Sequence, residues 1–123
     1  MMKLLVIAVI LATLAPAPPS YTETQATKGQ ILFYEQCAEC HGAALDGNFG
    51  PALSGDGGNL QWATVSYVWQ YVTAHMPAGN AGGLSTTDYL EIMAFLLKAH
   101  GNPAGKAPLT PQAALASKAL LGP

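Results

Sequence analysis

The sequence contains no arginine and only five lysines, against seven aspartates and glutamates in 123 residues. Charged residues make up only 10% of the chain, and its formal net charge at neutral pH is −2. A surface that binds nucleic acid needs clustered basic side chains to neutralise the phosphates. The composition therefore predicts no nucleic-acid partner.

The apolar run at the N-terminus is too short to span a bilayer. Residues 4–15 are almost all apolar, and prolines end the run. This length fits the hydrophobic region of a signal peptide, whereas a membrane-spanning helix needs about 20 apolar residues. We expect a signal peptide over residues 1–20, with a boundary between residues 15 and 26. Two sequences of small residues, 15–17 and 24–26, are the candidate cleavage sites. The remaining domain, 21–123, would be exported to the periplasm; the alternative is an uncleaved membrane anchor.

The only two cysteines of the chain lie three positions apart and are followed by a histidine, in the order C-x-x-C-H. Cys37 and Cys40 would lie on one side of a helical turn, within reach of the two vinyl groups of a haem. The imidazole of His41 would then come up beneath the iron. The motif predicts one covalently bound haem c, with two thioether bonds and His41 as the proximal iron ligand.

Two other sites could be built on paired cysteines. A zinc site usually has four ligands, and His75 and His100 are too isolated in the sequence to complete one. A thioredoxin-like redox pair lies near a βαβ pattern, and the sequence shows none. A covalent haem would also supply the apolar centre that a domain of about a hundred residues can barely build by itself.

Capping residues and apolar spacing predict helices separated by glycine-rich loops. The first is expected at about 28–38, with Thr27 as N-cap and Gln30 completing a capping box. The other predicted helices run over 64–74, from the Ser85 cap to the Gly101 stop, and from the Thr110 cap to about 118, with an irregular loop over 42–59. The many β-branched residues of 64–74 leave a strand open as an alternative.

The spacing of four residues around these helices resembles class I (monohaem) cytochrome c. In that family a glycine eight residues before the first haem cysteine lets the N-terminal helix cross the C-terminal helix closely, and Gly29 has this position. Phe33, four residues before the cysteine, and the pair Ile92 and Phe95 match the aromatic and apolar residues at the crossing. The resemblance implies an all-α cytochrome c fold, whose N- and C-terminal helices cross around a covalently bound haem.

Residues 50–53 resemble the G-P-x-L turn of the same family. There the proline carbonyl accepts a hydrogen bond from the outer N–H of the proximal imidazole, which orients the ring and raises its basicity. The resemblance implies that Pro51 orients His41. The alternative is an ordinary turn proline.

The Met76–Pro77 pair resembles the distal-ligand motif of class I cytochromes, and it lies in a loop of small residues after the 64–74 helix. His75 or His100 could replace Met76 as the sixth ligand, although a solvent-facing position is the simpler expectation for both. Met93 lies on the apolar stripe of its helix, where we expect it to fill the core.

Filled axial positions would leave no site for oxygen or peroxide chemistry, so the expected function is one-electron transfer and not an enzymatic reaction. The alternative is a five-coordinate haem protein that binds or senses a small gas. The aromatic residues Trp62, Tyr67 and Tyr71 are candidates for contacts with the haem or its propionates, or else are core residues.

The order of short motifs over 75–109 resembles the small cytochromes associated with quinoprotein (PQQ-dependent) dehydrogenases, although Gly101-Asn102 replaces their usual Asn-Gly. This resemblance implies a periplasmic dehydrogenase as electron donor and a terminal oxidase or other respiratory acceptor. The protein itself would be soluble or loosely membrane-associated.

Overall fold

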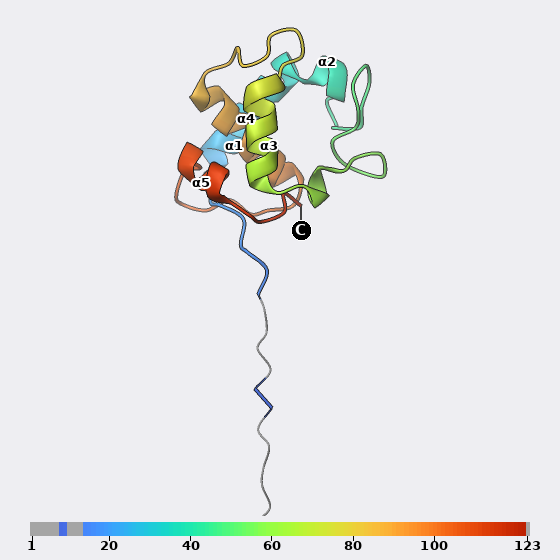
Figure 1. Cartoon of the computed structure of the whole chain (residues 1–123). Coiled ribbons are helices and arrows are strands. Elements are labelled where there is room, and N and C mark those ends of the chain that lie inside the picture. The colour runs from blue at the N-terminus through green and yellow to red at the C-terminus, as the bar shows by residue number, and fades with distance from the viewer. Residues whose placement is uncertain (1–7, 10–13, 123) are drawn as a thin grey trace, which may run out of the picture.

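The computed structural model describes residues 8–9 and 14–122. These residues form helices and loops, with no strand beyond a single bridge between Thr64 and Leu120. In chain order the elements are α1 (Glu23–Gln36), α2 (Ala38–His41), the 3-10 turn η1 (Leu60–Trp62), α3 (Val65–His75), α4 (Thr86–Ala99) and α5 (Pro111–Ala116) (Figure 1). The prediction of an all-α fold is confirmed.

Helix α1 begins five residues earlier than the sequence predicted. The Thr22 hydroxyl accepts a hydrogen bond from Gln25 N at 3.1 Å, and Gln25 Oε1 accepts one from Thr22 N at 3.1 Å. The predicted cap at Thr27 was wrong, because a second box with the same T-x-x-Q spacing lies directly upstream, at residues 22–25. The Gln25 side chain also donates to Leu109 O at 3.0 Å and accepts from Leu109 N at 2.8 Å, so a tertiary contact reinforces the upstream box.

The predicted helices in the second half of the chain are present. Thr64, Ser85 and Thr110 cap α3, α4 and α5, each accepting a hydrogen bond from the backbone three residues on. The strand alternative for 64–74 was wrong, because its β-branched Val65 and Val68 bury one helical face. Helix α5 ends at Ala116, two residues before the predicted end.

Helices α1 and α4 cross so closely that no side chain fits between them at Gly29. A Cβ atom added to this glycine would lie 1.8 Å from the carbonyl oxygen of Glu91. Beside this point the rings of Phe33 and Phe95 pack with their centroids 5.2 Å apart and tilted by 50°. Ile92 is also buried. The predicted crossing and its contact residues are confirmed.

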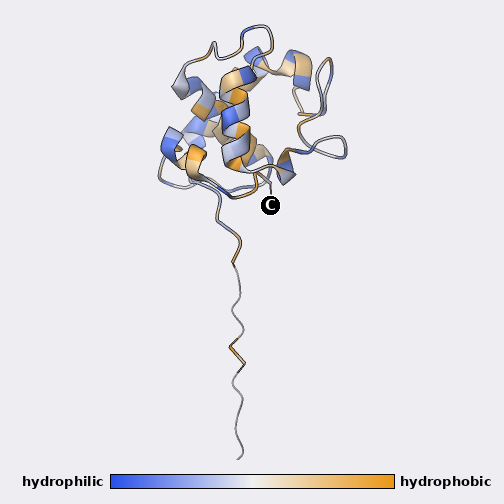
Figure 2. Ribbon diagram, viewed as in Figure 1, coloured by the Kyte–Doolittle hydropathy of each residue, from blue (hydrophilic) through white to orange (hydrophobic). Residues whose placement is uncertain are grey.

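Figure 2 shows apolar, orange stretches on the helices of the folded body. Helix α4 has most of its apolar residues buried, and it packs against both α1 and α3. Met93 and Leu97 are fully buried in this core, so the expectation that Met93 fills the core is correct. An exposed ion pair between Lys98 and Glu23 also joins α4 to α1. Its exposure means that it adds little to stability.

The folded body begins at about residue 20. Tyr21 is 1% exposed, its hydroxyl donates to Asn102 O, and its carbonyl accepts from Gly105 N at 2.8 Å. Residues 14–18 run outward as exposed chain (Figure 1). Most of the predicted hydrophobic region over 4–15 lies outside the described residues, and within those residues no helix has the length and apolar character to cross a membrane.

The geometry at Gly29 predicts a large loss of stability for Gly29→Val. Intrinsic helix propensity favours replacing a mid-helix glycine by up to about 1 kcal/mol, whereas overpacking costs about 1–3 kcal/mol. The obstructing atoms belong to the α4 backbone, which cannot rotate away as a side chain can, so we expect the upper end of the cost. Chemical denaturation of the haem-loaded protein should show a clearly lowered midpoint.

Gly57→Ala is the matched control, because its added Cβ would meet only the Ala52 Cβ at an ordinary 3.5 Å. We expect its midpoint to stay close to that of the wild type. An unchanged midpoint for Gly29→Val would contradict the close crossing.

Candidate haem-binding site

The C-x-x-C-H motif begins at the end of α1 and forms the single turn of α2. The Cys37 carbonyl accepts hydrogen bonds from Cys40 N at 3.2 Å and His41 N at 2.9 Å. This turn keeps both cysteines and the histidine within four residues of helix. Both thiols are free and half-buried, and Cys37 packs against the hydrophobic core. The anchoring of α1 on α4 therefore also fixes the position of the motif.

The imidazole of His41 is held by a backbone carbonyl. His41 Nδ1 lies 2.8 Å from Pro51 O, and because a carbonyl oxygen can only accept, Nδ1 carries the proton. The lone pair is then on Nε2, which is the nitrogen left available to a metal. The ring is half-buried, so it remains accessible.

The loop that carries Pro51 is fastened to the end of α2. Cys40 O accepts from Asn48 N at 2.9 Å and from Gly50 N at 2.7 Å, and His41 O accepts from Gly47 N at 2.8 Å. These bonds satisfy carbonyl groups that the end of a helix leaves without a partner. A Cβ at Gly50 would lie 3.2 Å from the Cys40 side chain, so a glycine allows this close return of the loop.

Met76 lies at the C-terminal end of α3 and is half-buried. Its carbonyl accepts a hydrogen bond from the Tyr89 hydroxyl at 2.7 Å and another from Gly82 N at 3.3 Å. Met93, in contrast, is fully buried among the helices. Of these two methionines, Met76 is the one with a side chain at the edge of the folded body.

The two remaining histidines differ in their surroundings. His75 is exposed and packs on the ring of Tyr71, with ring centroids 4.7 Å apart. This agrees with the expectation that its side chain faces solvent. For His100 that expectation was wrong. Its ring is buried, with Nδ1 2.7 Å from Leu96 O and Nε2 3.1 Å from Leu53 O. Both of its nitrogens face carbonyl oxygens, so neither is free for a metal in this conformation.

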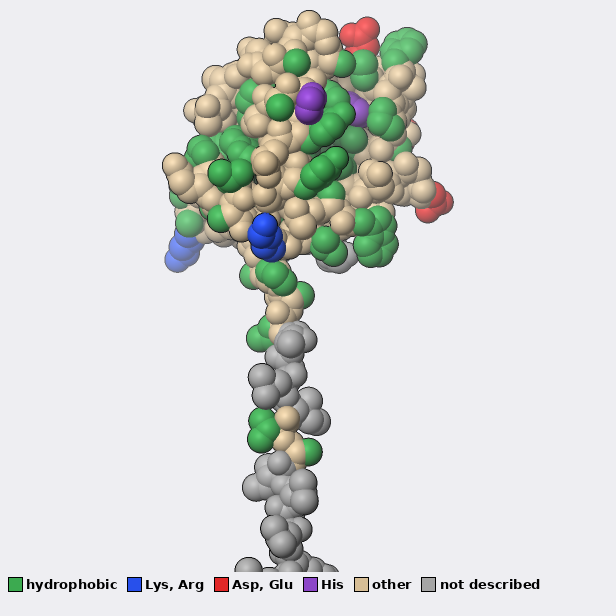
Figure 3. Space-filling model, in the orientation of Figure 1, with side chains coloured by type: hydrophobic (Ala, Val, Ile, Leu, Met, Phe, Trp, Pro, Cys, Tyr) green, Lys and Arg blue, Asp and Glu red, His purple; other side chains and the backbone are tan. Residues whose placement is uncertain are grey.

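The three aromatic residues singled out in the sequence are not core residues. Trp62, Tyr67 and Tyr71 are 73%, 60% and 44% exposed. Tyr67 and Tyr71 stack along α3 and, with Gln70 and His75, line an open cleft of about 230 Å³. Figure 3 shows hydrophobic and histidine side chains together on this face. Their contact with the haem stays a prediction.

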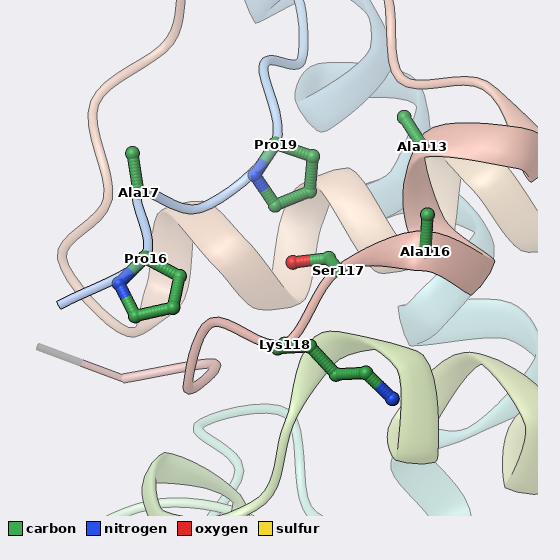
Figure 4. A pocket seen from close by; sticks show the side chains of 7 residues that line it. All are labelled: Pro16, Ala17, Pro19, Ala113, Ala116, Ser117 and Lys118. Atoms are coloured by element: carbon green, nitrogen blue, oxygen red, sulfur yellow. The ribbon is translucent and has the colours of Figure 1, made fainter.

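A larger groove of about 390 Å³ lies between the N-terminal segment and α5 (Figure 4). Its lining consists mainly of prolines and alanines, with Ser117 and Lys118 beside them. None of these side chains is a usual iron ligand. The groove is therefore separate from the C-x-x-C-H site.

The surroundings of the cysteines fit haem attachment better than the other two sites. Burial raises the pKa of the Cys37 thiol to about 11, and the Cys40 thiol adds to the shift. A redox-active cysteine pair depends on a lowered thiol pKa, whereas the pKa of Cys37 is raised. In the described part of the chain, no three His, Cys, Asp or Glu side chains gather as a zinc site would require. Two thiols and one imidazole with a free Nε2 match a covalent haem.

Comparisons with known proteins agree with this assignment. The model of the family described as "Cytochrome C oxidase, cbb3-type, subunit III" matches residues 24–96. The chain is 33% identical over 60 residues to cytochrome c-551 of Bacillus subtilis (strain 168), which covers 49% of this chain and 54% of that protein. A chain in the crystal structure of the sulfane dehydrogenase SoxCD from Paracoccus pantotrophus aligns with a TM-score of 0.58 and 34% identity, over 69% of this chain and 46% of its own length. This chain thus spans about half the length of the proteins that it matches.

The family match runs from α1 into α4, so it includes the crossing helices, the cysteine motif and the Met76 loop. The predicted resemblance to class I cytochrome c is confirmed by this match and by the fold. The association with PQQ-dependent dehydrogenases stays a prediction. The chain belongs to the cytochrome c family, within the group described as cytochrome c oxidase, cbb3-type, subunit III, and its cofactor is covalently bound haem c.

Proposed function

We propose that this chain is an exported one-electron carrier with a single haem c. Cys37 and Cys40 would form the thioether bonds, and His41 and Met76 would be the two axial ligands. The observation that carries the proposal is the 2.8 Å contact between His41 Nδ1 and Pro51 O within an intact C-x-x-C-H turn. This contact leaves Nε2 of His41 free to bind a metal, and the Pro51 carbonyl restricts the direction in which Nε2 points.

Pro51 would act on His41 by orienting it. A carbonyl acceptor fixes the tautomer of a ligating imidazole, restricts rotation of its ring and raises its basicity. The bonds from the 47–50 loop to the end of α2 hold that carbonyl in place. When bound, the haem supplies an iron that gains or loses one electron. The protein's part is to keep the ligands in place in both oxidation states.

Met76 is supported as the distal ligand by its position. It is half-buried at the end of a helix, whereas Met93 is enclosed in the core. His75 is the remaining alternative, because both ring nitrogens of His100 face carbonyl groups. With both axial positions filled, no open position would remain for oxygen or peroxide chemistry, which favours a carrier over an enzyme or a gas sensor.

The partners would be redox proteins. The matching family is described by an oxidase subunit, and the similar solved structure is a dehydrogenase. These names favour a dehydrogenase, PQQ-dependent or of another kind, as donor and a respiratory oxidase or other protein as acceptor. The absence of arginine and the net negative charge disfavour nucleic acid.

The fold limits where a signal peptide could be removed. Cleavage after residues 24–26 would fall inside α1 and remove Tyr21 and the Thr22 cap, both of which the body uses. We therefore expect the exported protein to begin between residues 16 and 20. The intact mass of protein purified from the periplasm checks this, and a mature start at Thr27 would contradict it.

Covalent attachment can be tested by extraction. We expect wild-type protein, made together with haem-attachment machinery, to keep its haem through acid-acetone treatment and to show the added mass. Cys37→Ser or Cys40→Ser should leave mostly unfolded apoprotein, because the cofactor completes a small core. Met76→Ala is the control, since it removes an iron ligand and should still retain the haem covalently. Loss of haem from the wild type to the solvent would contradict the proposal.

Axial ligation can be tested by comparing substitutions of Met76 and Met93. Met76→Ala should abolish the near-infrared sulfur–iron band of the oxidised protein, lower its reduction potential and open the iron to carbon monoxide. Met93→Leu conserves core volume, so it should keep the band and cost less than about 1.5 kcal/mol. His75→Ala should also keep the band. A wild-type protein with a high-spin spectrum and no such band would support the gas-binding alternative instead.

A further inference from the structure

The hydroxyl group of Tyr89 makes two hydrogen bonds from inside the molecule. Tyr89 lies near the beginning of α4 and is only 4% exposed. Its hydroxyl donates to Met76 O at 2.7 Å and accepts from Leu84 N at 3.3 Å. One buried side chain is thus bonded to two backbone groups that are eight residues apart in the sequence.

These two groups are the ends of the loop that follows α3. Between them the loop makes only internal hydrogen bonds, from Asn80 N to Pro77 O and from Gly83 N to Asn80 O, both at 2.9 Å, and from Gly82 N to Met76 O at 3.3 Å. Residues 78–83 are exposed. Within the described chain, the only other hydrogen bond between this loop and the rest is the helix-terminal one from Met76 N to Val72 O. The Tyr89 hydroxyl therefore provides most of the polar attachment of the loop.

The hydroxyl is itself held by the best-packed part of the fold. The Tyr89 ring belongs to the buried cluster that contains Ile92 and Met93, on the helix that α1 crosses at Gly29. Leu84, at the far end of the loop, packs against the same cluster. The loop thus consists mainly of small residues, but both of its ends are hydrogen-bonded to a side chain of a buried helix.

We propose that Tyr89 is a positioning residue for Met76. By closing the 76–84 loop at both ends, its hydroxyl restrains the Met76 backbone and so limits how far the thioether can swing away from the site. The Tyr89 hydroxyl is bonded to the main chain of Met76 and not to its sulfur. It therefore affects how often the Met76 side chain leaves the iron, but not the identity of the iron ligand. The inference rests on the proposed function, in which Met76 is the distal ligand.

The variant that tests this is Tyr89→Phe, which keeps the ring and removes only the hydroxyl. Imidazole added to the oxidised haem protein competes with Met76 for the iron, so its affinity reports how easily the loop opens. Loss of a hydrogen bond of ordinary net strength predicts about five- to tenfold tighter imidazole binding. Tyr34→Phe is the matched control, because Tyr34 is 70% exposed on α1 and makes no hydrogen bond among the described residues.

A second measurement needs no variant and does not depend on the iron ligand. In the wild-type protein, the Leu84 amide should exchange with deuterium clearly more slowly than the Ala81 amide, which has no hydrogen-bond acceptor among the described residues. Tyr89→Phe should remove this protection by a factor similar to the gain in imidazole affinity. Agreement of the two factors would support the proposal even if the variant were generally less stable.

The outcomes separate this inference from the proposed function. A wild-type protein with the sulfur–iron band, but with equal imidazole affinity in Tyr89→Phe and Tyr34→Phe, would overturn the role of Tyr89 and leave Met76 as the ligand. Unprotected exchange at Leu84 in the wild type would likewise overturn it. A wild-type protein without the band would overturn both.

Discussion

The absence of a side chain at Gly29 lets two helices approach to backbone contact, and the position of the haem motif depends on that approach. The carbonyl of Glu91 occupies the space that a Cβ would need. Helix α1 is therefore fixed on α4 along its length, with Phe33 and Phe95 packed beside the contact. Because Cys37 follows α1 directly, the same contact determines where the cysteine turn lies.

Helix α4 contacts two different loops, one near each of its ends. Near its beginning, Tyr89 is bonded to the carbonyl of Met76. At its C-terminal end, His100 contacts the carbonyl of Leu53, two residues after Pro51. The loops that carry Pro51 and Met76 are otherwise glycine-rich and largely exposed. A single helix thus gives two irregular loops a common, rigid reference.

The sequence was informative where the chemistry is local. The spacing of the cysteines and His41, the caps of three helices and the interval from Gly29 to Cys37 can each be interpreted within a few turns of chain. The start of α1 was mispredicted because two equivalent capping boxes follow one another, and the contact of Gln25 with Leu109, 84 positions away, favours the first of them. No local pattern marks such a partner.

The same limit explains the residues that sequence reasoning missed. The spacing of apolar residues places Tyr89 on the same helical stripe as Met93, but it does not show which group accepts from the Tyr89 hydroxyl. His100 was expected in solvent, since it follows the last turn of a helix, yet the returning 50–53 loop covers it. Cofactor chemistry was thus predictable from a pentapeptide, whereas the supports around it depended on the tertiary fold.

The burial of Tyr21 has a geometric consequence for how this domain could meet its partners. The chain enters the body where Tyr21 is bonded to residues 102 and 105. Figure 1 shows that the N-terminal segment joins the body on its lower side, while α2 and the end of α3 lie toward the top. The lysine side chains visible in Figure 3 lie at the lower end of the body, whereas the visible acidic side chains lie at its top and at its right-hand edge. A domain held by its N-terminal segment, whether during export or on a surface, would be tethered at one pole, with the cysteine turn of α2 toward the other.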